Sequence, residues 1–115
     1  MRKALLVFAL AAMTMVGTAS MALASTTLQW TGQGGENLPC SGGGHWVLTG
    51  QGITSATMTV KGVQYVMHQN GNGSFAADSN GFIGAATTAS VTYEGSARNP
   101  QFVLSHCGEG GGYPY

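Results

Sequence analysis

Glycine divides this chain into short segments, and that division constrains the fold more than any other feature of the sequence. The clusters lie at 32–35, 42–44, 50–52, 71–73 and 110–112. The segments between them are rich in Val, Thr, Tyr and Phe, which favour strands, whereas glycine favours turns. Because no helical periodicity is found after residue 24, the sequence predicts an all-β protein.

The stretch SATMTVKGVQYVMHQNG, which begins at Ser55, shows the strand pattern most clearly. Apolar and polar residues alternate on both sides of Lys61-Gly62, so that every second side chain points to the same face. Two alternating segments around a short glycine-containing turn are typical of a β-hairpin.

The whole pattern gives seven candidate strands, at 26–30, 45–49, 56–61, 63–68, 74–77, 89–95 and 101–107. Pro100 is expected to stop pairing between the last two. Seven short strands favour a single immunoglobulin-like β-sandwich closed by one disulfide, with a small β-barrel as the alternative. The expected core residues are Trp46, Leu48, Met58, Val60, Tyr65, Val91, Tyr93, Phe102 and Leu104.

Residues 1–24 have the three parts of a secretory signal peptide: basic Arg2 and Lys3, an apolar run over 4–16, and the small residues of Ala22-Leu23-Ala24. The apolar run is shorter than the ~20 residues that a membrane span needs. We therefore expect removal of 1–24, no membrane span after it, and a secreted, cell-surface or periplasmic protein. Residues 25–107 form the predicted β-domain, and 108–115 a flexible tail rich in Gly and Tyr.

The two cysteines, Cys40 and Cys107, are an even number in an exported chain, which predicts one disulfide. Closing a loop of this length restricts the unfolded chain by about 4 kcal/mol in the loop-entropy model. Trp46 is then expected to pack against the disulfide in the core.

Charge is scarce after residue 24, where Lys61 and Arg98 stand against four acidic residues, Glu36, Asp78, Glu94 and Glu109. A nucleic-acid partner is not predicted, because phosphate backbones need several clustered cations. So little charge also repels other copies of the chain weakly, which lowers the electrostatic barrier to self-association.

His45 lies five residues after Cys40, and His106 directly precedes Cys107, so the disulfide would bring both histidines together. Two imidazoles can supply two of the ligands of a copper or zinc site. The remaining ligands are scarce, because His68 lies on a different hairpin and neighbouring residues of a strand face opposite ways. A metal site at His45 and His106 stays an alternative to a structural role.

No catalytic residue, cofactor or enzymatic activity is predicted. The chain contains no Gly-x-Ser-x-Gly elbow, its cysteines are expected in the disulfide, and its carboxylates are isolated in the sequence.

The segments CSGGGHWVLTG, ATMTVKGVQYVM, GNGSF and FVLSHC together resemble a loosely defined group of small secreted β-sandwich domains of prokaryotic surface proteins. The resemblance covers most of 40–107. It implies an immunoglobulin-like or prealbumin-like fold at a surface, with Cys40, Trp46, His106 and Cys107 as framework, and it implies no function.

The leading hypothesis is a non-enzymatic structural or interaction protein that contributes to a cell-surface layer, fibre or extracellular matrix. It would self-associate, or bind other surface proteins, through its sheet edges. The strand at 26–30, Trp30 and the tail residues Tyr113 and Tyr115 are the predicted interaction elements. The alternative is a soluble extracellular binding module, which holds a metal through histidines or a carbohydrate or protein ligand through Trp30, Tyr65 or Tyr93.

Overall fold

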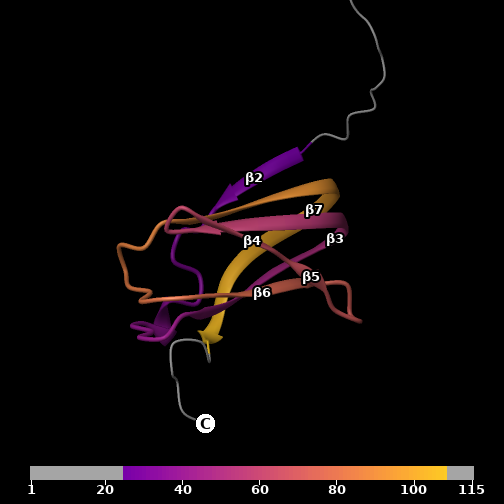
Figure 1. Ribbon diagram of the computed structural model, residues 1–115. Helices are drawn as coiled ribbons and strands as arrows, with labels where there is room; N and C mark the ends of the chain where they lie inside the picture. The colour runs from indigo at the N-terminus through magenta and orange to yellow at the C-terminus, as the bar shows by residue number, and fades with distance from the viewer. Residues whose placement is uncertain (1–24, 109–115) are drawn as a thin grey trace, which may run out of the picture.

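The computed structural model describes residues 25–108, in which the regular structure is mostly antiparallel β-strand (Figure 1). The strands are β2 (Ser25–Gln29), β3 (Gly44–Val60), β4 (Val63–Val66), β5 (His68–Gln69), β6 (Phe75–Ser79) and β7 (Ala89–Cys107), with a 3-10 turn, η2, at Gly35–Asn37. The all-β prediction is confirmed. The predicted signal peptide and the tail with Tyr113 and Tyr115 lie outside the described residues. Within 25–108, no helix has the length and apolar character to cross a membrane.

The six strands of the described residues belong to one sheet, in the order β2-β7-β3-β6-β5. β4 pairs with β3 on the side away from β7. The first half of β3 therefore lies between β7 and β6, and its second half lies between β7 and β4.

The strand boundaries differ from the predicted ones because the chain passes through several glycines without leaving the sheet. Segments 45–49 and 56–61 join in β3, and segments 89–95 and 101–107 join in β7. Segment 63–68 instead divides into β4 and β5. Pro100 lies inside β7, at an irregularity where neither it nor Asn99 has a register partner on β3. A proline is tolerated there because no ladder hydrogen bond is required of it.

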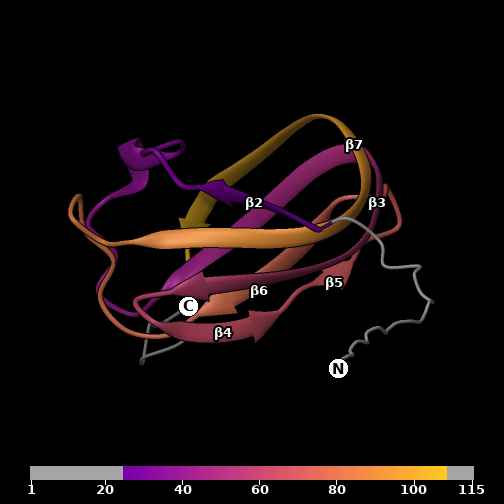
Figure 2. The same cartoon turned by 90° about the horizontal axis from the view of Figure 1, so that it is seen from above.

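β3 and β7 bend together, and the bend turns the sheet back over itself (Figure 2). The register between them shifts repeatedly from Thr49 to Ser55. Gly52 and Gly95 have φ values of +92° and +104°, and a Cβ at either would lie 2.1 Å from a backbone oxygen of the opposite strand. Only glycine fits this close crossing, which lets two long strands supply both halves of the sheet.

The core fills the space that the bent sheet encloses. Trp46 is fully buried in it, stacked on Phe102 with ring centroids 5.2 Å apart and in edge contact with Trp30 at 5.0 Å. The structure buries all the expected core residues except Tyr65, which is half-buried against the same cluster. The buried cluster also includes Cys40, Ile53, Ala56, Met67, Phe75, Ile83 and Ala89.

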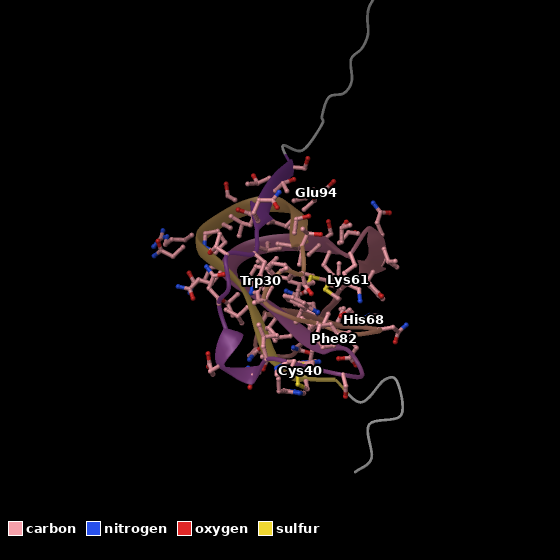
Figure 3. The ribbon with its side chains drawn as sticks, turned by 90° about the vertical axis from the view of Figure 1, so that its left-hand side faces the viewer. Trp30, Cys40, Lys61, His68, Phe82 and Glu94 are labelled. Atoms are coloured by element: carbon pink, nitrogen blue, oxygen red, sulfur yellow. A yellow bond between two sulfur atoms is a disulfide. The ribbon has the colours of Figure 1, made fainter. Side chains whose placement is uncertain are left out.

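The predicted disulfide between Cys40 and Cys107 is confirmed, with the two Cα atoms 5.2 Å apart. Cys40 also exchanges two backbone hydrogen bonds with Ile83, of 2.9 and 2.8 Å. The disulfide therefore fastens the end of β7 and the segment before β3 to the loop after β6. Figure 3 shows Cys40 at the end of the molecule opposite Glu94.

Candidate functional site

The structure brings the two predicted metal-ligand candidates, His45 and His106, into direct contact. They are register partners on β3 and β7, and their rings stack with centroids 4.6 Å apart and planes inclined by 12°. Asp78, the partner of His45 on β6, extends this row across the sheet, with 2.6 Å between Nδ1 of His45 and Oδ1 of Asp78. Nδ1 of His106 donates to the carbonyl oxygen of Cys107 at 2.8 Å.

This stacked arrangement does not point both imidazoles at one metal ion. The nitrogen lone pairs lie in the ring planes, and two nearly parallel planes direct them side by side. Over residues 25–108, no group of three or more His, Cys, Asp or Glu side chains is arranged to hold a metal. His68, on β5, lines a shallow hollow of about 440 Å³ together with His45 and Asp78. The sequence did not predict the contact with Asp78, because only the pairing of β3 with β6 creates it.

The aromatic side chains proposed for ligand binding pack inward. Trp30 is half-buried on Trp46, and its Nε1 donates to the carbonyl oxygen of Gln33 at 2.8 Å. Tyr93 is buried, and the hydroxyl of half-buried Tyr65 accepts a 3.1 Å hydrogen bond from the backbone N–H of Asn80. Stacking on a ligand needs a ring face that is exposed to solvent, and most of the surface of these rings is packed against the core.

The sheet edges are treated differently in the two halves of the bent sheet. In the half that contains β6, the outer edge of β7 is covered by the segment before Cys40. The N–H of Leu104 donates to the carbonyl oxygen of Gln33 at 3.0 Å, and Nδ2 of Asn37 donates to the carbonyl oxygens of Leu104 and Ser105 at 3.1 and 3.2 Å. The opposite edge is β5, which is two residues long. A covered edge and a very short edge both resist pairing with another chain.

The other half ends in two open strands. Within the described chain, β2 pairs only with β7, and β4 pairs only with β3. Neither STTLQ nor VQYV contains a charged residue or a proline, the residues that natural proteins place on edges to block pairing. On β4, Val63 is 52% exposed and Val66 is 71% exposed. β2 and β4 together are named here the open edges.

The outer face between the open edges is polar and almost uncharged. The register aligns Thr27, Thr92, Thr57 and Val66 in one row across four strands, and Gln29, Ser90, Thr59 and Gln64 in the next. The hydroxyl oxygens of Thr27 and Thr92 lie 2.9 Å apart, within hydrogen-bond distance. Such a face imposes little charge repulsion on a neighbour placed beside it.

A comparison of this chain with protein-family models, curated proteins and solved structures finds no significant match.

Proposed function

We propose that this chain is a secreted, non-enzymatic structural protein, in which the two halves of the bent sheet act as the layers of one immunoglobulin-like β-sandwich. Copies of the domain self-associate into a cell-surface or extracellular assembly. One observation carries the proposal: the same half of the sheet ends on both sides in open, uncharged strands, β2 and β4. Unpaired strand edges are templates for pairing with another chain.

The charges of the described residues support self-association. The charged side chains are Lys61 and Arg98 against Glu36, Asp78 and Glu94, and none of them lies on β2 or β4. Removal of 1–24 adds a single amino group, on Ser25 at the start of β2. Lys61 Nζ donates to the carbonyl oxygen of Phe82 at 2.7 Å, which holds its charge over the loop after β6. Repulsion between approaching copies is therefore small along the open edges.

The disulfide supports the secreted location. Disulfides persist in oxidising compartments, and this one links buried Cys40 to the end of the longest strand. A small domain exposed outside the cell gains stability from such a cross-link.

Negative-stain electron microscopy and sedimentation of the non-reduced chain from Ser25 onward test the proposal. We expect regular fibres or sheets whose amount rises with protein concentration at physiological salt. Near-UV circular dichroism of the same sample is the control, because packed aromatics such as Trp30 and Trp46 give that signal only in the native fold. Uniform monomers at every concentration would contradict self-association.

A further inference from the structure

We infer that copies join head to tail, with β4 of one copy paired to β2 of the next, so that one antiparallel sheet runs through the assembly. This inference rests on the self-association proposed above and specifies the partner and the interface. The partner is a second copy of this chain, and the interface consists of the two open edges.

The strand directions fit such a junction. β2, β7, β3 and β4 form a row in which every neighbouring pair is antiparallel. The two strands at the ends of a row of four therefore run in opposite directions. Figure 2 shows them at opposite sides of this half of the sheet. A copy that is shifted sideways without rotation places its β2 antiparallel to the first copy's β4, the same relation that every internal pair has.

The backbone groups on the open edges also fit. Antiparallel strands present alternate residues to each side. The N–H of Met67 donates to the carbonyl oxygen of Ala56 at 3.0 Å, in phase with the Tyr65–Met58 pair, so the backbone groups of Gln64 and Val66 point away from β3. The N–H of Trp30 donates to the carbonyl oxygen of Ala89 at 2.9 Å, so Trp30 faces β7. By alternation, the backbone N–H and C=O groups of Thr27 and Gln29 point away from β7. The open edge of β4 thus offers two residues with backbone donors and acceptors that β3 does not use, and the open edge of β2 offers Thr27, Gln29 and, by the same alternation, Ser25.

The side chains at the junction are compatible on both faces. β4 has four residues and β2 has five, so their lengths match closely. Val63 lies on the core-facing side of β4 and Val66 on the outer side, because their register partners are buried Val60 and half-exposed Thr57. Pairing with β2 of the next copy would cover apolar surface on each face, and cross-strand contacts of β-branched residues stabilise a sheet.

The junction uses two different surfaces, so it does not close on itself. A head-to-tail contact between copies related by translation grows into an open filament, whereas a contact between identical edges makes a closed dimer. This difference provides a test that separates the inferred junction from every other mode of self-association.

The test uses two variants, each of which blocks one open edge. Gln64→Pro removes the outward N–H from β4, and Thr27→Pro removes the outward N–H from β2, while neither N–H serves the chain's own ladder. We expect each variant alone to be monomeric by sedimentation. An equimolar mixture should give a heterodimer of twice the monomer mass and nothing larger. The intact β2 of the Gln64→Pro variant pairs with the intact β4 of the Thr27→Pro variant, and the remaining two edges are both blocked. Each variant in small amounts should shorten wild-type fibres.

If a proline variant fails to fold, lysine variants at the same two positions test the same junction. Gln64→Lys and Thr27→Lys place a charge on the same edges, and Thr92→Lys is the matched control, since Thr92 lies on the same outer face but in central β7. The control should assemble like the wild type, and all three should unfold at similar temperatures.

Two results would contradict the β4–β2 junction without contradicting self-association. One is fibre formation by the edge variants at the wild-type level, which would place the contact elsewhere. The other is a dimer formed by a single edge variant alone, which would indicate pairing of identical edges. A wild-type chain that stays monomeric would instead overturn both the inference and the proposed function.

Discussion

At the scale of single residues, the core contains a buried hydrogen bond between two side chains, those of Trp46 and Ser79. Trp46 is fully buried, and its Nε1 donates to Oγ of Ser79 at 2.8 Å. Ser79 is 1% exposed. A buried donor without a partner carries its full desolvation cost, so these two groups depend on each other.

Ser79→Ala is therefore expected to lower the free energy of unfolding by about 1–3 kcal/mol, because the indole N–H of Trp46 loses its acceptor. Denaturant unfolding followed by tryptophan fluorescence measures the change. Ser90→Ala, on the outer face of β7, is the matched control and should shift stability by less than about 0.5 kcal/mol. Equal stability of the Ser79 variant and the wild type would show that the contact contributes nothing.

The residues of the candidate site were predictable only as far as sequence neighbours determine them. The positions of His45 and His106 beside the two cysteines were enough to place the histidines together. The contact of His45 with Asp78 was not predictable, because it depends on the register of β3 against β6, 33 residues apart in the chain. Register is set by the whole buried face of a strand and by its turn, which a single residue does not reveal.

At the scale of elements, the sequence located the strand segments and misplaced their ends. Alternation marked 45–49 and 56–61 correctly as extended, but Gly50-Gln51-Gly52 has the composition of a turn. Glycine gives the same conformational freedom to a turn and to a bend inside a strand. The partner strand decides between them, and here β7 follows β3 through the bend. The sequence also did not show that β4 is an edge strand, because alternation of apolar and polar residues does not indicate how many neighbouring strands a strand has.

The bend makes a specific prediction about glycine. A Cβ at Gly52 would lie 2.1 Å from the backbone oxygen of Ser96, whereas a Cβ at Gly62 would meet nothing within 4 Å. Both residues have similar positive φ values, +92° and +83°. Gly62→Ala should cost about 1 kcal/mol for the left-handed backbone alone. Gly52→Ala should cost about 2 kcal/mol more, since the two strands must also move apart.

Chemical denaturation of the two alanine variants measures this difference directly. Gly71→Ala serves as a baseline, because Gly71 has open space around it and no positive φ. Equal losses of stability in the Gly52 and Gly62 variants would mean that the strands at the bend separate without cost.

At the scale of the whole molecule, the two halves of the sheet cannot be independent. β3 and β7 run through both, and one buried cluster, from Ile53 and Val91 in one half to Trp46 and Leu104 in the other, packs between them. The spacing of the predicted strands indicated a single β-domain, but it could not distinguish two separate sheets from one sheet that bends. Both arrangements bury the same alternate side chains.

The disulfide acts on this whole unit, because Cys40 and Cys107 are 67 residues apart and enclose all of the described strands except β2. Reduction should therefore lower the free energy of unfolding by about 4 kcal/mol, through the larger entropy of the open unfolded chain. Guanidinium unfolding with and without reductant measures this shift, and a single transition is expected in both cases because the halves share their core. A variant with Cys40→Ala and Cys107→Ala is the control, which reductant should leave unchanged. Two separate transitions after reduction would mean that the long strands do not couple the halves and that the cross-link does.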